Sequence, residues 1–445
     1  MNEVVLNELP DNWEWTKLGN VVTKIIGGGT PAKNKPQYWE GDIPWLTVKD
    51  MRSRRPADAV DHISEKAVEE SSTNIIPEDT VIIATRIGLG KVIRVPYKAA
   101  INQDLKALVV PTEIDKGYLE YWFVSKANYL GSIGSGTTVK GIRLEQVRDL
   151  DFPLAPPEQQ KRIVAKIDEL FSHIDAGIEA LKKAKQLLKQ YRQSVLKAAV
   201  TGELTKEWRE ANKDKLEPAS ELLEKIEIAR NAWIEKETAK DNSEAKRLKN
   251  KLTKHEFEEL DSSSVPEGWE SVSLTKLCLL VVDCHNKTAP YVESGIPLIR
   301  TSNIRDGVIK FKEKMKFVNQ ETYEYWSRRC PPEPGDILFT REAPMGESAI
   351  IPENTKVCMG QRMMLLRVIL DLVDVEYLHI ALMEPLFQKR VQGFKVGVGV
   401  PHLRVGDVEK AVVALPPFIE QKEIVRVASD RLDAITRLEN ELDQK

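Results

Sequence analysis

The stretch Asp79-Thr80-Val81-Ile82-Ile83-Ala84-Thr85-Arg86 occurs a second time, in altered form, as Gly335-Asp336-Ile337-Leu338-Phe339-Thr340-Arg341. Its apolar run lies between Pro77-Glu78-Asp79 and Gly88-Leu89-Gly90, which is typical of a buried strand that ends in a glycine-rich turn. The alternating stretch Lys91-Val92-Ile93-Arg94-Val95 is expected to be its hairpin partner. We therefore expect a similar buried strand in each half of the chain.

Other stretches repeat in the same order. Leu9-Pro10-Asp11-Asn12-Trp13 is echoed by Val265-Pro266-Glu267-Gly268-Trp269, and Leu154-Ala155-Pro156-Pro157 by Leu415-Pro416-Pro417-Phe418. The offset between copies stays at about 255–261 residues, far above the roughly 20–50 residues of a solenoid repeat. The sequence thus predicts a duplicated domain, suited to binding two similar but non-identical targets.

Size and composition are those of a globular protein. The 445 residues suggest about two to four domains, and the apolar fraction of 42% is enough for a core in each half. No apolar run reaches the ~18 residues of a membrane span, and the first residues do not resemble a secretory signal. The net charge of −3 is unlike that of a simple nucleic-acid-binding domain, although local cations or partner subunits can supply phosphate contacts.

Cysteine usage favours a reduced, cytoplasmic protein. None of the cysteines is spaced as C-x-x-C, and all lie in the second half: Cys278, Cys284, Cys330 and Cys358. Cys284-His285 is an isolated pair, whereas zinc requires more ligands at set spacing. We therefore predict no metal site.

The sequence pattern changes at Pro156-Pro157. Proline favours the first turn of a helix, and a long amphipathic pattern follows these prolines, so we expect a helix to begin here. We expect this helix to end at Gly202. A similar pattern follows Pro416-Pro417, and two narrow apolar seams predict two helices that pair as an antiparallel coiled coil. The seam positions are Ile163, Ile167, Leu170, Ile174, Ile178, Leu181 and Leu188 in the first copy, and Ile424, Ile435 and Leu442 in the second.

The predicted fold class is α/β with mixed α+β character, in two duplicated domains joined by long antiparallel coiled-coil helices. The predicted boundaries are 1–155 for the first domain, 156–202 for its spacer helix, 203–264 for a charged linker or helical connector, 265–415 for the second domain and 416–445 for its spacer helix. Lys445 corresponds to Ala184, so we interpret the second spacer helix as apparently truncated. We expect this to weaken docking of one partner or to invite a second chain to complete the pair.

These features resemble the DNA-specificity subunit of type I restriction-modification enzymes. The resemblance rests on the duplicated layout, on Gly335 to Arg341, on the Pro-Pro-x-x-Glu-Gln-Lys helix start at Pro416 to Lys422, and on Val195 to Thr205. It implies that each globular domain is a target-recognition domain for one half of a split DNA sequence. The helices would set the gap and dock two adenine methyltransferase subunits, and through them the restriction subunits. S-adenosylmethionine, ATP and Mg²⁺ would bind those partners, with no cofactor in this chain.

No catalytic motif accompanies the resemblance, so we predict a non-catalytic subunit. An adenine methyltransferase is expected to carry Asn/Asp-Pro-Pro-aromatic, and none of the Pro-Pro pairs here follows Asn or Asp. Arg86-Ile87-Gly88-Leu89-Gly90-Lys91 lacks the full nucleotide-loop pattern. One alternative is a specificity subunit of another phage-defence methylation system. A second is a stand-alone DNA-modifying enzyme, which the missing motifs disfavour, and a third is a pure coiled-coil assembly protein, which would not explain two mixed domains.

Candidates for DNA contact lie at strand ends matched between the copies: Thr47, Lys49, Arg86, Arg300, Ser302 and Arg341. Arg86 and Arg341 are expected to close the same strand, where an arginine binds guanine edges or phosphate unless it forms a structural ion pair. The glycine-rich loops before the long helices add Lys140, Arg143, His402 and Arg404, unless these charges are simply solvated. In the connector, Trp208 and Trp233 are expected either to anchor a partner or to pack back on the chain.

Overall fold

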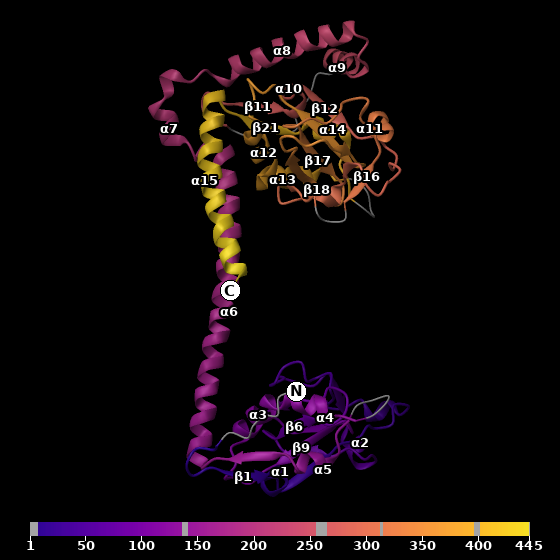
Figure 1. The fold of residues 1–445 in the computed structure, drawn as a ribbon, viewed down its shortest axis with the longest axis vertical. Coiled ribbons are helices and arrows are strands. Elements are labelled where there is room, and N and C mark those ends of the chain that lie inside the picture. Colours follow the sequence, from indigo (N-terminus) through magenta and orange to yellow (C-terminus); the bar gives the residue numbers. More distant parts are fainter. Residues whose placement is uncertain (1–7, 136–140, 255–264, 312–314, 396–400, 445) are drawn as a thin grey trace. The chain divides into compact units, whose positions relative to one another are not determined.

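The computed structural model describes residues 8–135, 141–254, 265–311, 315–395 and 401–444. The chain divides into two compact units, Met1–Glu179 and Ala180–Lys445, called unit 1 and unit 2 below (Figure 1). The long helix α6 (Pro157–Val200) begins in the first and ends in the second. The prediction of a mixed fold of strands and helices is confirmed.

Unit 1 is built on two four-stranded sheets. The first has the order β2-β9-β6-β7, in which β6 (Val81–Ala84) is antiparallel to both neighbours. The second has the order β4-β3-β8-β5, in which β3 (Ile43–Leu46) and β8 (Ala99–Ile101) are parallel. The remaining strands of these sheets are β2 (Lys24–Gly27), β4 (Asp61–Ile63), β5 (Ile75–Ile76), β7 (Val92–Arg94) and β9 (Leu105–Val109).

Strand β6 is buried on both faces, as its uninterrupted apolar run predicts. Val81 and Ile83 face a cluster that includes Trp122 of α3, whereas Ile82 and Ala84 face the second sheet. A small ribbon of β1 (Glu14–Lys17) and β10 (Asp151–Leu154) lies beside these layers. The helices of the unit are α1 (Leu18–Val21), α2 (Glu65–Glu69), α3 (Lys116–Ser125), α4 (Ala127–Ile133) and α5 (Leu144–Arg148).

Unit 2 repeats this plan. Its main sheet has the order β12-β20-β17-β18, built from β12 (Leu280–Asp283), β17 (Ile337–Arg341), β18 (Met345–Ile350) and β20 (Met363–Arg367). The second sheet has the order β16-β13-β19, built from β13 (Ile296–Ile299), β16 (Lys316–Val318) and β19 (Cys358–Met359). A ribbon of β11 (Glu270–Ser273) and β21 (Val412–Leu415) matches β1 and β10, and β14 (Ile304–Arg305) pairs with β15 (Val308–Ile309).

Beyond the connector, the helices of unit 2 follow the same order as those of unit 1. They are α10 (Leu274–Leu277), α11 (Gln320–Ser327), α12 (Val375–Met383), α13 (Pro385–Gly393), α14 (Val405–Lys410) and α15 (Phe418–Asp443). The tyrosine hydroxyls that fix the equivalent helices α3 and α12 make the same bond. Tyr118 donates to the Pro153 carbonyl and Tyr377 to the Ala414 carbonyl, each at 2.8 Å. The duplication therefore extends to individual side-chain contacts.

The connector is helical and belongs to unit 2. It contains α7 (Lys206–Ala211), α8 (Ala219–Ala239) and α9 (Ser243–Lys254). Figure 1 shows α8 running past α10, and Leu222 and Ile226 are buried in the main core cluster of the unit. The connector is therefore a packed element of the unit over its described residues.

Helix α15 lies against the C-terminal part of α6 in unit 2 (Figure 1). Lys185 Nζ lies 2.5 Å from Asp443, and Arg192 lies 2.8 Å from Glu439, so the helices run antiparallel. Partly buried Leu188 packs with Ile424 and Ile435, which are both buried. These contacts form the predicted seam.

The seam differs from the prediction in the N-terminal part of α6. Ile163 is half-buried against the core of unit 1. Leu170, Ile174 and Ile178, expected as spacer core, are exposed. The reason is that α15 pairs only with the C-terminal part of α6, its last residue Asp443 meeting Lys185. Of the remaining predicted positions, Ile167, Leu181 and Leu442 are half-buried.

Candidate nucleic-acid interface

Three strands of unit 1 end beside one open cavity. The backbone N–H of Asn102, just after β8, donates to the carbonyl of Leu46, the last residue of β3, at 3.0 Å. Strand β6 ends next to them at Ala84. The cavity measures about 890 Å³, and its lining includes Thr47, Lys49, Ile87, Asn102, Gln103 and Asp104. The fold thus brings together polar residues that lie far apart in the sequence.

Thr47 and Lys49, both predicted candidates, line this cavity in different ways. Thr47 is buried, and its hydroxyl donates to Asp50 Oδ2 at 3.0 Å while its backbone N–H donates to the same oxygen at 2.7 Å. Lys49 is exposed, with Nζ 4.0 Å from a carboxylate oxygen of Asp61. Thr47 therefore orders the loop, and the Lys49 ammonium is the group that can reach a phosphate.

Arg86 is held by a carboxylate at the same strand ends. Its Nη1 lies 3.4 Å from Asp104 Oδ1, and its side chain is 52% exposed whereas that of Asp104 is 11% exposed. A guanidinium has five N–H donors, so one carboxylate contact leaves others for a ligand. The arrangement orients an exposed arginine while the buried carboxylate supplies the counter-charge.

Arg341 does not match Arg86, contrary to the sequence prediction. The Arg341 N–H donates to the Arg362 carbonyl, as the Thr85 N–H donates to the Asp104 carbonyl. Arg341 therefore occupies the position of Thr85, one residue earlier than predicted. The Thr-Arg dipeptide common to both copies is misleading, because the hydrogen-bonded ladder, and not residue identity, sets the register.

Arg341 instead holds the loop that precedes α14. Its Nη1 donates to the Leu403 carbonyl at 3.0 Å, and the Leu403 N–H donates to the Arg341 carbonyl at 3.0 Å. In unit 1 the Ile142 N–H donates to the Thr85 carbonyl at 2.9 Å. The described ends of the two predicted loops, at Ile142 and Leu403, thus bond to the ends of β6 and β17 in the same way.

The counterpart of Arg86 is Glu342, and it too is ion-paired. Glu342 Oε2 lies 2.6 Å from Nη1 of Arg362, whose side chain is 56% exposed. Arg362 in turn corresponds to Asp104 of unit 1 through the ladder described above. Both units therefore present an exposed arginine paired to a carboxylate at the same place, with the two partners exchanged.

The other predicted residues lie around these strand ends. Arg300 and Ser302 flank the start of a short 3₁₀ turn, and Ser302 is exposed. Arg143 and Arg404 are the exposed N-cap residues of α5 and α14. His402 is half-buried and bridges to the backbone of Glu342. Lys140 lies outside the described residues.

Unit 2 also carries an aromatic cluster that the sequence prediction missed. The His285 ring centroid lies 4.7 Å from that of Trp326 and 5.5 Å from that of Tyr325, and the Arg328 guanidinium lies 4.1 Å from the Tyr325 centroid. Burial, followed by the charges of Arg328 and Lys287, lowers the pKa of His285. The cluster offers stacking faces and a cation, which suit single bases and phosphate groups.

The two connector tryptophans differ from simple surface anchors. Trp233 is half-buried against a core cluster of unit 2 that contains Ile234 and Leu248. Trp208 is half-buried on α7, and its carbonyl accepts a hydrogen bond from Asn212 at 2.8 Å. For Trp233 the structure thus supports the alternative of packing back on the chain.

The described part of the chain shows neither a metal-binding cluster nor a membrane-spanning helix. It holds no cluster of three or more His, Cys, Asp or Glu side chains arranged to bind a metal ion. Within the same residues, no helix is both long and apolar enough to span a membrane.

Known proteins share this architecture. A crystal structure of the HsdS subunit from Thermoanaerobacter tengcongensis superposes with a TM-score of 0.57 at 16% identity, covering 98% of this chain and 93% of that chain. The MjaIX type I restriction enzyme specificity subunit of Methanocaldococcus jannaschii is 24% identical over 93% of this chain and 85% of its own length. The EcoBI specificity subunit of Escherichia coli is 27% identical over 79% of this chain and 66% of its own length.

A family model provides the assignment. The model described as type I restriction modification DNA specificity domain matches residues 10–188 and again residues 266–445. The two matches coincide with the two copies of the internal repeat, and together they cover most of the chain. This protein therefore belongs to the type I restriction-modification DNA-specificity family.

Proposed function

We propose that this chain is the DNA-reading subunit of a type I restriction-modification complex and that each unit reads one half of a split target. The observation that carries the proposal is the pair of exposed arginines at matched strand ends, Arg86 beside Asp104 and Arg362 beside Glu342. An arginine that is fixed by a carboxylate can bind guanine O6 and N7 in the major groove. Its remaining donors can bind phosphate.

The exchange of partners favours two different half-sites. In unit 1 the arginine follows strand β6, whereas in unit 2 it precedes strand β20. The guanidinium therefore starts from a different backbone position in each unit. The aromatic cluster around His285 and Trp326 adds a further difference, because the strand register places Gly29, which has no ring, at the position of His285 in unit 1.

The charge of the chain favours shared DNA binding within a complex. With a net charge of −3, affinity for DNA rests on local cations such as Lys49, Arg86 and Arg362. Partner subunits would supply additional phosphate contacts, and the salt dependence of the complex would then exceed that of this chain alone.

The chain is proposed to be non-catalytic and to dock two methyltransferase subunits and the restriction subunits. Membership of the specificity family supports this role. S-adenosylmethionine, ATP and Mg²⁺ would then bind the partners. The expected cytoplasmic location follows from the same proposal.

A partner-dependence assay tests the proposal. The purified chain should transfer no methyl groups from S-adenosylmethionine to DNA. Mixed with the methyltransferase subunit encoded beside it, it should direct methylation to adenines of one split motif. Methyl transfer by the chain alone would contradict the proposal.

A further inference from the structure

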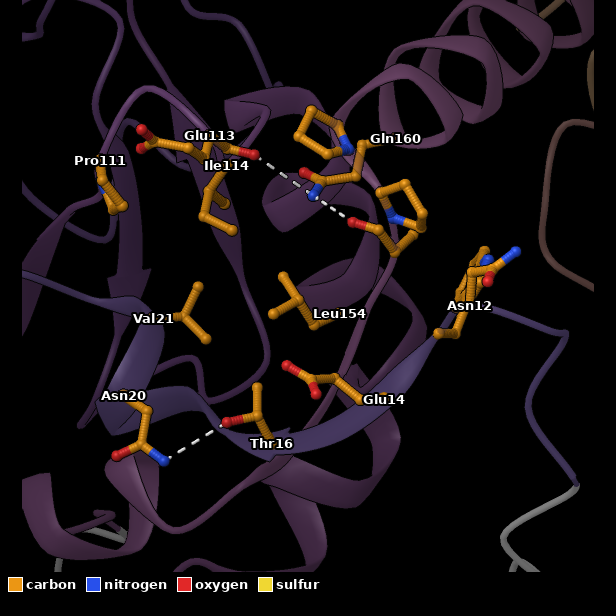
Figure 2. A pocket seen from close by; sticks show the side chains of 14 residues that line it. Asn12, Glu14, Thr16, Asn20, Val21, Pro111, Glu113, Ile114, Leu154 and Gln160 are labelled. Carbon is orange, nitrogen blue, oxygen red and sulfur yellow. Dashed lines mark hydrogen bonds between the residues drawn. The ribbon is translucent and has the colours of Figure 1, made fainter.

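Unit 1 has an open cavity of about 840 Å³ beside the β1–β10 ribbon and the start of α6 (Figure 2). Figure 2 shows Val21, Ile114 and Leu154 in its middle, with Glu14 and Glu113 at opposite edges. Its lining contains these two carboxylates and neither lysine nor arginine. Val21 and Ile114 are each 6% exposed, so the open apolar surface comes mainly from the half-buried Trp13 and Leu154, with the exposed carboxylates of Glu14 and Glu113 at its rim.

The same surface is covered in unit 2. The counterparts of Val21, Ile114 and Leu154 are Leu277, Val373 and Leu415, which belong to one buried cluster. That cluster also contains the α8 residues Ala219, Leu222 and Ile226. Unit 2 thus shows what fits this surface, namely an amphipathic helix that buries one apolar stripe.

Polar contacts fix α8 in its place. The N–H of Ala219, the first residue of α8, donates to the Gly268 carbonyl at 2.9 Å. Arg230 Nη1 donates to the Lys276 carbonyl at 2.6 Å, near the C-terminus of α10. A helix in this position therefore pairs its N-terminus with a turn carbonyl and a cation with helix-end carbonyls.

Unit 1 retains the features that receive such a helix. Asn12 (φ 69°) matches Gly268 (φ 82°) in the same left-handed turn. The Trp13 indole donates to Gln159 at 2.5 Å, as the Trp269 indole donates to Glu420 at 2.8 Å. The left-handed turn and the tryptophan hydrogen bond to the first turn of the long helix are thus present in both units.

Matched residues of this surface are more exposed in unit 1 than in unit 2. Trp269 and Leu415 are 4% and 0% exposed, whereas their counterparts Trp13 and Leu154 are only half-buried. Pro156 is half-buried, and its counterpart Pro417 is buried. Leu415 shares its buried cluster with the α8 residues Leu222 and Ile226. Trp269 instead packs with Val195 and Ala199 of α6, and the Arg209 guanidinium of α7 lies 5.7 Å from its ring centroid.

The residues at the rim indicate which kind of helix fits the surface of unit 1. Glu113 replaces Leu372 at the rim, and Thr16 replaces Val272. The surface of unit 1 is therefore more polar and more acidic than the one that receives α8, so a basic helix complements it.

We propose that this face of unit 1 binds an amphipathic helix from a partner protein, in the position that α8 takes in unit 2. The helix carries an apolar stripe toward Trp13 and Leu154, and lysine or arginine opposite Glu14 and Glu113. This interaction is independent of DNA reading, so loss of one does not entail loss of the other.

A labelled peptide of residues 216–236 is the probe, because it contains most of α8. Fluorescence anisotropy with the full chain measures its affinity. A version with Glu221→Lys and Glu224→Lys should bind about fivefold tighter at low salt than the native peptide, because each exposed charge pair adds a modest gain. Adding Ile226→Asp to the basic peptide should abolish detectable binding.

Matched variants of the chain locate the binding site. Glu14→Gln combined with Glu113→Gln should remove the preference for the basic peptide, whereas Glu270→Gln, the unit 2 counterpart of the first change, should not alter it. An equal effect of the variants in the two units, or absence of peptide binding, would overturn the proposal. So would a concentration-dependent dimer in sedimentation that excludes the peptide, because the occupant would then be a second copy of this chain.

Discussion

Arg86 Nη1 lies 3.4 Å from Asp104 Oδ1, and at the same place in unit 2 the carboxylate and the guanidinium have exchanged strands. In unit 2, Glu342 follows strand β17, and Arg362 precedes the neighbouring strand β20. A buried structural ion pair would not require the arginine to be exposed in both units. The exposure of both arginines instead fits side chains held ready for a ligand.

Arg86→Ala should relax recognition of one half-site, and Arg362→Ala should relax the other. Each loss should cost about 1–3 kcal/mol of discrimination at one base pair, because one guanidinium contact is removed. Sequencing of methylated adenines in DNA modified by the assembled complex measures both motifs.

Lys17→Ala is the control for these changes. It removes an exposed ion pair of 2.7 Å with Asp151, which lies outside the candidate site at the ends of β3, β6 and β8. Its motif should be unchanged. Equal relaxation of both half-sites by a single arginine variant would contradict separate reading by the two units.

Insertion of seven residues between Leu181 and Leu188 should lengthen the gap in the DNA target. Seven residues add about 10 Å of helix and keep the seam in register, which corresponds to roughly three base pairs. The half-sites themselves should stay the same. Motif mapping checks this, and an unchanged gap would refute a spacer role for α6.

Glu420→Ala should destabilise unit 2 by about 3 kcal/mol, because three donors lose one buried carboxylate. Glu420 is fully buried and accepts hydrogen bonds from Thr205, Arg209 and Trp269 at 2.7–2.8 Å. Urea unfolding measures the change.

Gln159→Ala is the matched variant in unit 1. It should cost only about 1 kcal/mol, since Gln159 accepts a single neutral side-chain hydrogen bond, from Trp13, among the described residues. Similar losses for the two variants would show that the turn after α6 does not stabilise unit 2 through Glu420.

Stability of unit 2 should fall as the pH drops from about 7 toward 5. Burial lowers the pKa of His379, and the Ser348 carbonyl 3.1 Å from its Nε2 offsets this only in part. The unfolded chain therefore binds a proton at higher pH than the folded chain, so stability rises with pH in this range. Urea unfolding at pH 7.5, 6.5 and 5.5 gives the free energy of unfolding as a function of pH. This free energy should change less with pH in His379→Gln than in the unaltered chain, and an identical dependence would exclude His379 as its source.

Local patterns in the sequence predict much of this fold. The run Val81 to Ala84, the helix start at Pro157 and the seam residue Ile424 each follow from local periodicity and proline placement. The repeat then assigns the same plan to the second half. Local patterns suffice where burial on both faces or along one stripe determines the element.

The candidate site was less predictable, because it depends on cross-strand register. Arg362 contacts Glu342 because β17 pairs with β20. His285, just after β12, contacts Trp326, which lies on α11. The exposure of Ile174 is likewise invisible to the periodic pattern, which predicts a buried seam along the whole of α6. Such contacts join segments separated by tens to hundreds of residues, so no local pattern reveals them.

The most direct test of the central claim is a map of methylated adenines made by this chain together with its neighbouring methyltransferase subunit. The account predicts one motif of two different half-sites separated by a fixed, unspecified gap, with Arg86→Ala altering only one half and Arg362→Ala only the other. A continuous motif, or two identical half-sites altered together by either variant, would contradict it.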